Sequence, residues 1–319
     1  MLRRFLRRHY HRFIKPDLVK HQLATAKSVL HLEFHGEGIG FFAQLSACLH
    51  AFRHAEAHGL TPFIKLSSPN YLDSGMGDDW FQYYFDHQTP PGDTQPGNRR
   101  ALRIGDISEM PGISSDLSLA EANTLFFKHV RIKPGIGAAV DQFCQTHLIG
   151  AGTLGIHYRG TDKKEEAVLL GYDAAFSKIG AVLMQRPGVT NLFVASDEQA
   201  FINRIAGRFP HLPVVTFEDS VRSQDGRPVH LGQRAPGNYL MGLDALMNSL
   251  LLSRCGAVAR TTSFLSAWSS IFNPALPVFL LSVPYSGKLW FPEREIIGSA
   301  TLMDGYAAAR PSAPLPRYH

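Results

Sequence analysis

The chain alternates between short apolar runs with a two-residue period and longer runs with a helical period. In the N-terminal half, a strand pattern at 28–36 is followed by a glycine-rich turn, a helical pattern at 41–59 and a second strand pattern at 61–66. Gly59 stands at the end of that helical pattern, where glycine is favoured. This order predicts a β-α-β unit.

A second alternation of strands and helices begins at residue 153. Strand patterns are expected at 153–160, 191–197, 213–219, 257–263 and 277–282, the last of which closes the pattern. Helical patterns are expected at 172–188, 198–210, 239–256 and 264–274, and an earlier one at 121–148 breaks at Pro134.

The two alternations predict an α/β protein with two Rossmann-like parallel-sheet domains that face each other across a cleft. The expected division is a basic tail at 1–22, an N-terminal domain at 23–148, a C-terminal domain at 149–300 and a flexible tail at 301–319.

Polar and glycine residues gather where four of the predicted strands end. They are Gly38–Gly40, His157–Lys163, Ser196–Glu198 and Thr261–Ser263. Because ligands of such folds bind past the carboxyl ends of the strands, these groups are expected to line one shared cleft.

Arg159 lies just past the core of the strand at 153–160. A guanidinium makes paired, charge-assisted hydrogen bonds to phosphate, so Arg159 is a candidate diphosphate clamp. The alternative is a structural ion pair with Asp162 or a neighbouring acid. His157 lies two residues earlier on the same face of the strand, which favours a shared site over a local structural bond.

Two other strand ends allow two interpretations each. Thr261, Thr262 and Ser263 precede a helical pattern, so they either cap that helix or hold phosphate oxygens. Asp197 either caps the helix that follows it or orients Arg159 or His157.

The sequence contains no metal-binding pattern. It has no HExxH and no pair of Asp residues two apart, so the chemistry is expected to need no metal ion. The glycine turn at 36–40 suggests a dinucleotide site, but Phe41 replaces the third glycine of that pattern. The next strand also lacks the expected acid at its end, so NAD binding ranks below phosphate binding.

Positive charge is concentrated at the N-terminus. The chain of 319 residues has a formal net charge of +5, but six cationic side chains lie within residues 3–15, so the remainder is close to neutral. A nucleic-acid binder would carry its cations on the folded domain, and that class is excluded. The basic tail is either a solvated terminus or a segment that lies on an anionic membrane surface.

The cysteines indicate the redox compartment, and the apolar runs show whether a membrane span is expected. Cys48, Cys144 and Cys255 form no CxxC pair, and they suit a reducing compartment as small buried hydrophobic side chains. No apolar run is long enough to predict a membrane span.

The segment HYRGTDK at 157–163 resembles the His-x-Arg-x-x-Asp-Lys segment of the α1,6-fucosyltransferases, a group of bacterial nodulation-type and eukaryotic N-glycan core enzymes. Further segments resemble that family in the same order, namely 36–66, 127–143, 193–210 and 245–268. The resemblance covers roughly residues 28–285.

The resemblance implies a GT-B fold and an inverting, metal-independent transfer of fucose from GDP-fucose, with the donor held mainly by the C-terminal domain. It implies that Arg159 binds the β-phosphate and balances the charge of the leaving GDP. The implied donor-site residues are His157, Arg159, Gly38, Gly40, Asp197, Thr262 and Ser263.

The resemblance also implies an acceptor side for a glycan or a glycolipid. Glu166 is the candidate base for the acceptor hydroxyl, and Asp162 is a second candidate catalytic residue. The candidate acceptor contacts are Asp162, Lys163 and Glu165.

The chain departs from the family at several positions. Gly160 stands where the eukaryotic motif has its second arginine, and Ala167 stands where the family has its acidic residue. Asn248 stands at the helical position where the family has an aspartate that binds guanine. Guanine recognition therefore requires Asp244, one turn earlier, to take that role. Two alternatives therefore stay open: a GT-B enzyme that uses another nucleotide sugar, and a non-catalytic saccharide-binding protein.

The sequence shows neither the membrane anchor nor the C-terminal SH3-like domain of the eukaryotic enzymes. This favours a bacterial enzyme in the cytoplasm or at the surface of the inner membrane.

Overall fold

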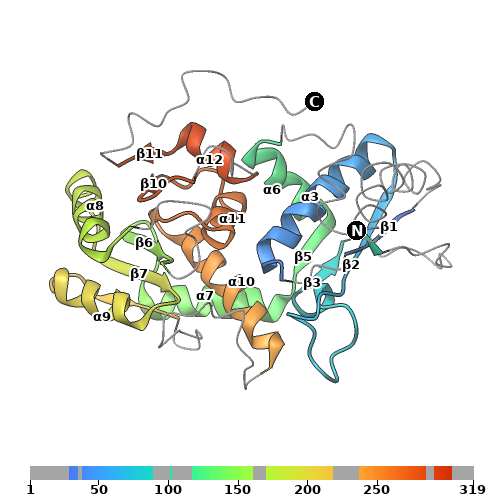
Figure 1. Ribbon diagram of the computed structural model, residues 1–319, viewed down its shortest axis with the longest axis horizontal. Coiled ribbons are helices and arrows are strands. Elements are labelled where there is room, and N and C mark those ends of the chain that lie inside the picture. Colours follow the sequence, from blue (N-terminus) through green and yellow to red (C-terminus); the bar gives the residue numbers. More distant parts are fainter. Residues whose placement is uncertain are drawn as a thin grey trace, which may run out of the picture. The chain divides into compact units, whose positions relative to one another are not determined.

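The computed structural model of the protein describes residues 29–34, 38–88, 101–102, 117–160, 170–217, 237–284 and 291–303 (Figure 1). These residues form two compact units. The first contains the described residues up to 117 together with 124–133, and the second contains 118–123 and the described residues from 134 onward. The division falls earlier in the chain than the boundary expected at residue 148.

The tail expected at 1–22 lies outside the described residues. Among the helices that are described, none combines the length and the apolar character that crossing a membrane requires.

The first unit begins with the expected β-α-β unit. Strand β1 (Val29–Phe34), helix α3 (Phe41–Ala57) and strand β2 (Thr61–Leu66) follow one another, and the two strands pair in parallel. Strand β4 (Ala101–Leu102) pairs in parallel with the other edge of β1. Gly59 has a φ of +64° directly after α3, which confirms the glycine that ends this helix.

The first unit also holds an antiparallel strand pair. Helix α4 (Phe81–Tyr84) leads into β3 (Phe85–His87), which pairs with β5 (Val130–Ile132). The helical pattern expected at 121–148 is therefore divided into α6 (Leu119–His129), β5 and α7 (Pro134–His147). The break at Pro134 is confirmed, because this proline begins α7 at a position where its missing N–H is not needed.

The second unit is built on a sheet whose six strands are all parallel, in the order β11-β10-β9-β6-β7-β8. The strands are β6 (Thr153–Tyr158), β7 (Asn191–Ser196), β8 (Val214–Val215), β9 (Ala257–Arg260), β10 (Val278–Leu280) and β11 (Thr301–Leu302). The helices that alternate with them are α8 (Tyr172–Gln185), α9 (Gln199–Arg208), α10 (Asn238–Arg254), α11 (Phe264–Phe272) and α12 (Glu293–Ser299).

The expected alternation is confirmed for this unit, with one correction. The run at 277–282 does not close the pattern, because α12 and β11 follow it and β11 pairs with β10. Neither element has a long apolar run: α12 begins with charged residues, and β11 has two residues.

Helices cover both faces of the six-stranded sheet (Figure 1). On one face, Ile156 and Ala259 pack with α8 and α9. Leu280 belongs to a separate cluster with α11 and α12, whereas its two neighbours along the chain belong to the first cluster. Since successive side chains of a strand point to opposite faces, His157 and Arg260 lie on the face that α11 and α12 cover.

The strand order reverses between β6 and β9. The chain starts the sheet at β6 and adds β7 and β8 on one side, then returns to β9 on the other side and continues outward to β10 and β11. In open parallel sheets the crevice at such a reversal, past the carboxyl ends of the strands, is where ligands bind. Here that place lies between the residues that follow β6 and β9.

Candidate functional site

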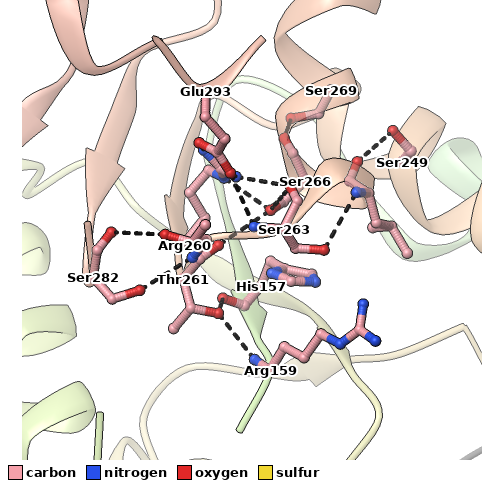
Figure 2. A network of polar contacts seen from close by, with 12 residues as sticks. His157, Arg159, Ser249, Arg260, Thr261, Ser263, Ser266, Ser269, Ser282 and Glu293 are labelled. Carbon is pink, nitrogen blue, oxygen red and sulfur yellow. Dashed lines mark hydrogen bonds and ion pairs between the residues drawn. The ribbon is translucent and has the colours of Figure 1, made fainter. Parts of the chain in front are cut away.

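The turn after β9 is organised around a buried arginine. Arg260, the last residue of β9, has a side chain that is 0% exposed and forms an ion pair with both carboxylate oxygens of Glu293 on α12. Its Nε also donates to Ser266 Oγ at 2.8 Å, and one Nη donates to the Ser263 carbonyl at 2.8 Å. Figure 2 shows the guanidinium between Glu293 and the turn. A buried guanidinium with this many partners is a fixed structural support.

The next residues use their backbone groups inside the protein. The N–H of Thr262 donates to Ser282 Oγ at 3.1 Å, and the N–H of Ser263 donates to Glu293 Oε1 at 3.0 Å. Ser263 Oγ accepts from the N–H of Leu265 at 3.3 Å, which confirms Ser263 as the N-cap of α11. Ser263 is 2% exposed, and its hydroxyl oxygen is the acceptor in that bond.

Arg159 directly follows β6 and lies beside this turn. Its backbone N–H donates to Thr261 Oγ1 at 3.0 Å. Its Nε lies 3.9 Å from Asp197 Oδ2, just past the end of the neighbouring strand β7. Asp197 is not the cap of α9, since Glu198 occupies that position. The structure thus favours Asp197 as an orienting partner of Arg159.

His157 is 4% exposed, and its carbonyl accepts from the N–H of Thr261 at 2.9 Å. In Figure 2 its ring and the guanidinium of Arg159 extend in the same direction from β6. The expectation that these two side chains share a face is confirmed.

A carboxylate occupies the space beside Gly160. A Cβ at Gly160 would collide with Glu198 Oε1 and would lie 3.0 Å from the Tyr158 hydroxyl. The hydroxyl of Tyr172 donates to the other carboxylate oxygen of Glu198. Burial and this hydrogen bond raise the pKa of Tyr172 to about 12, so the phenol stays protonated and continues to donate at neutral pH. Gly160 is therefore packed against an acidic side chain at the place where the eukaryotic motif has its second arginine.

Asp244 and Asn248 form a side-chain pair on α10. The amide of Asn248 donates to Asp244 Oδ1 at 2.8 Å and to the Asp244 carbonyl at 3.0 Å. Asn248 is 5% exposed, whereas Asp244 is only partly buried. The amide of Asn248 thus holds the partly buried carboxylate of Asp244 in place.

Gly38 and Gly40 belong to the first unit. Gly38 has a φ of +69°, which favours glycine, and Gly40 is the N-cap of α3. The buried amide of Gln44 donates to the carbonyl of Ile39 and to Ser68 Oγ, each at 3.0 Å, and holds the turn in place. That Gly38 and Gly40 share a cleft with the strand ends of the second unit stays a prediction.

Four predicted site residues, Asp162, Lys163, Glu165 and Glu166, lie outside the described residues. Within the described ranges, no three His, Cys, Asp or Glu side chains gather closely enough to hold a metal ion.

Arg260 and Glu293 were not predicted from the sequence to be parts of this region, and Thr261 was predicted only as a member of the Thr261–Ser263 group. Arg260 carried a local signal, a charge at the end of an apolar strand. Glu293 carried none, because its partner lies 33 positions earlier in the chain.

Comparisons with known proteins bear on this arrangement. No protein-family model matches the chain. Nodulation protein Z of Sinorhizobium fredii (strain NBRC 101917 / NGR234) is 25% identical over 175 residues, which are 51% of this chain and 53% of that protein. The match thus spans about half the length of this curated relative.

Solved structures resemble the chain over more of its length. The crystal structure of NodZ α-1,6-fucosyltransferase soaked with GDP-fucose superimposes with a TM-score of 0.52 at 17% identity, covering 79% of this chain and 94% of that one. The fucosyltransferase NodZ from Bradyrhizobium superimposes with a TM-score of 0.51 at 17% identity, covering 79% and 95%. These findings confirm the expected GT-B fold and the resemblance to the α1,6-fucosyltransferases.

Proposed function

We propose that this protein is a fucosyltransferase that transfers fucose from GDP-fucose to a glycan or glycolipid acceptor, with inversion at the anomeric carbon and without a metal ion. The observation that carries the proposal is the position of Arg159. It follows β6 at the reversal of strand order, next to Asp197 and to the N-terminus of α11. The similar NodZ structure was soaked with GDP-fucose, which supports this class of donor.

The chemistry needs positive charge at the leaving group. When the bond between fucose and GDP breaks, negative charge develops on the β-phosphate, and a guanidinium can neutralise it through two hydrogen bonds. Arg159, oriented by Asp197, supplies that charge. The Ser263 hydroxyl and the positive end of the α11 dipole add further stabilisation on the same side.

The acceptor hydroxyl attacks the anomeric carbon from the side opposite to GDP. As the new C–O bond forms and the bond to GDP breaks, the proton of the hydroxyl passes to a general base. We assign this base to Glu166, with Asp162 as the second catalytic residue and Asp162, Lys163 and Glu165 as acceptor contacts. In this proposal the second unit holds most of the donor, and Gly38 and Gly40 are the donor contacts that the first unit contributes.

Asp244 is the proposed reader of guanine. A carboxylate accepts from both N–H groups on the Watson–Crick edge of guanine, and the Asn248 amide orients it. Because the family's aspartate is absent at 248, a second candidate function is the same transfer from another nucleotide sugar.

The test is donor turnover. The purified protein is incubated with GDP-fucose and a panel of oligosaccharide and glycolipid acceptors, with and without EDTA, and GDP release and product configuration are measured. Parallel assays use UDP- and ADP-linked sugars. We expect fucosylated product of inverted configuration, unaffected by EDTA and lost in Arg159→Ala.

Turnover of a different nucleotide sugar would support the second candidate. Saccharide binding without turnover of any donor would indicate a non-catalytic saccharide-binding protein. That alternative rests on the departures from the family motif at Gly160 and Ala167. Full activity of Arg159→Ala would remove the basis of the proposal.

A further inference from the structure

We propose that Thr261 is a positioning residue for Arg159 and that the buried Arg260–Glu293 ion pair fixes the turn that carries Thr261. The inference rests on the proposed function, because the contribution of Arg159 is measured as the affinity of the protein for a nucleoside diphosphate.

The bond between Arg159 and Thr261 replaces a rung of the ladder between β6 and β9. In that ladder the N–H of Thr261 donates to the His157 carbonyl at 2.9 Å. The next rung of a parallel pair would run from the N–H of Arg159 to the carbonyl of Thr261. That carbonyl instead lies 3.4 Å from the hydroxyl of Ser266, and the N–H of Arg159 donates to Thr261 Oγ1 at 3.0 Å (Figure 2).

A side-chain hydroxyl therefore holds the backbone of Arg159 one residue past the end of the strand. The rung is displaced because the chain must leave the sheet at Thr261 to enter α11. Fixing the backbone there removes conformational freedom from Arg159. The side chain then extends from one backbone position, which lowers the entropy cost of placing its guanidinium on a ligand.

The ion pair sets the course of this turn. Arg260 donates to the carbonyl of Ser263 at 2.8 Å, and Glu293 accepts from the N–H of the same residue at 3.0 Å. Both backbone groups of Ser263 are thus held by one buried pair. Ser282 Oγ holds the N–H of Thr262 at 3.1 Å. Thr261 lies between these fixed residues and β9, which leaves its hydroxyl directed at β6.

Within the described residues, the Thr261 hydroxyl contacts the backbone around the end of β6: it accepts from the Arg159 N–H at 3.0 Å and lies 3.5 Å from the His157 carbonyl. We therefore expect its effect on binding to pass through Arg159. Thr261→Val keeps the shape of the side chain and removes the hydroxyl, whereas Thr261→Ser keeps the hydroxyl and removes the methyl group. We expect Thr261→Val to weaken GDP binding about fivefold, the effect of one net hydrogen bond, and Thr261→Ser to stay within about twofold.

A double-mutant cycle distinguishes positioning from general support of the fold. GDP affinity is measured by calorimetry for wild type, Thr261→Val, Arg159→Ala and the double variant. If Thr261 positions Arg159, we expect Thr261→Val to weaken GDP binding about fivefold when residue 159 is arginine. When residue 159 is alanine, we expect the loss to be less than about twofold. Equal losses in both backgrounds, or equal losses in Thr261→Val and Thr261→Ser, would overturn the proposal.

Amide hydrogen exchange without nucleotide tests the contact independently of the proposed function. We expect the Arg159 N–H to exchange at least about tenfold faster in Thr261→Val than in wild type or Thr261→Ser. Unchanged protection would overturn this inference even in a protein that binds GDP. Faster exchange in a protein that binds no GDP would support the contact and contradict the proposed function instead.

Discussion

Short polar side chains hold the candidate site together. Thr261 fixes the backbone of Arg159, Ser263 caps α11, and Ser282 holds the N–H of Thr262. Each side-chain oxygen accepts a hydrogen bond from a backbone N–H that the sheet or helix leaves without its regular partner. Arg159, the residue that carries the charge, therefore depends on these uncharged side chains as well as on Asp197.

Base recognition is testable at Asp244 and Asn248. Asp244→Asn removes the carboxylate that the guanine N–H groups require, and hydrogen bonds to a charged acceptor are worth more than neutral ones. We expect GDP affinity to fall about tenfold or more, with little change in the affinity for inorganic pyrophosphate. Both affinities can be measured by calorimetry.

The exchanged pair is the matched control for this prediction. Adding Asn248→Asp to Asp244→Asn restores one carboxylate and one amide in the opposite order, and we expect GDP affinity to recover in part. If Asp244→Asn weakens GDP and pyrophosphate alike, the pair supports α10 and does not read the base.

The sequence was sufficient to select Arg159 and Asp197 as candidates, because both are charged residues at the ends of apolar strands in a predicted parallel sheet. It could not assign Asp197, since capping and ion pairing place the same residue type at the same position. It could not connect Arg260 to Glu293, because the ion pair depends on α12 returning to the sheet, and no local pattern encodes that contact.

Helix α12 is the element whose importance to the site is least visible in the sequence. It has seven residues, yet it brings Glu293 to a buried arginine and packs Ile296 against α11. Its amphipathic pattern is too short to predict a helix. Strands β5 and β11 were missed for a similar reason, since they have three and two residues.

Glu293→Gln tests the contribution of α12. The substitution leaves the fully buried guanidinium of Arg260 without a countercharge, so we expect the free energy of unfolding to fall by about 3 kcal/mol or more. Urea unfolding followed by circular dichroism measures the change.

Glu295→Gln, on the same helix, is the matched control. Glu295 is partly exposed and lies 3.5 Å from Arg294, a pair that contributes less than about 1 kcal/mol. Losses of equal size in both variants would contradict the role assigned to the Arg260–Glu293 pair.

Helix α3 gives the first unit a pH dependence. Burial, with a smaller effect of Arg53, lowers the pKa of His50 to about 4 from a usual value of 6.5. Because the unfolded chain binds this proton more readily, the contribution of His50 is present above pH 6.5 and is lost as the pH falls towards 4.

We therefore expect wild type to lose about 2 kcal/mol more unfolding free energy than His50→Gln between pH 7 and pH 5. Urea unfolding at the two pH values gives this difference. Identical pH dependence in wild type and His50→Gln would show that folding does not lower the pKa of His50.

For the molecule as a whole, the order of the strands in the second unit decides where chemistry can occur. The sequence predicted the alternation of strands and helices, and parallel pairing follows from it. It did not predict that β6 and β9 are neighbours, because several strand orders satisfy one alternation. That neighbourhood places Arg159 beside the turn that caps α11, and the proposed donor site depends on it.

The proposed donor site can be tested by calorimetric titration of the purified wild-type protein with GDP and, in parallel, with UDP, both in metal-free buffer. We expect GDP to bind, UDP to bind more weakly, and Arg159→Ala to lose about tenfold or more of the GDP affinity. Failure of the wild type to bind GDP, or equal GDP affinity of wild type and Arg159→Ala, would contradict the claim that Arg159 holds the diphosphate of the donor.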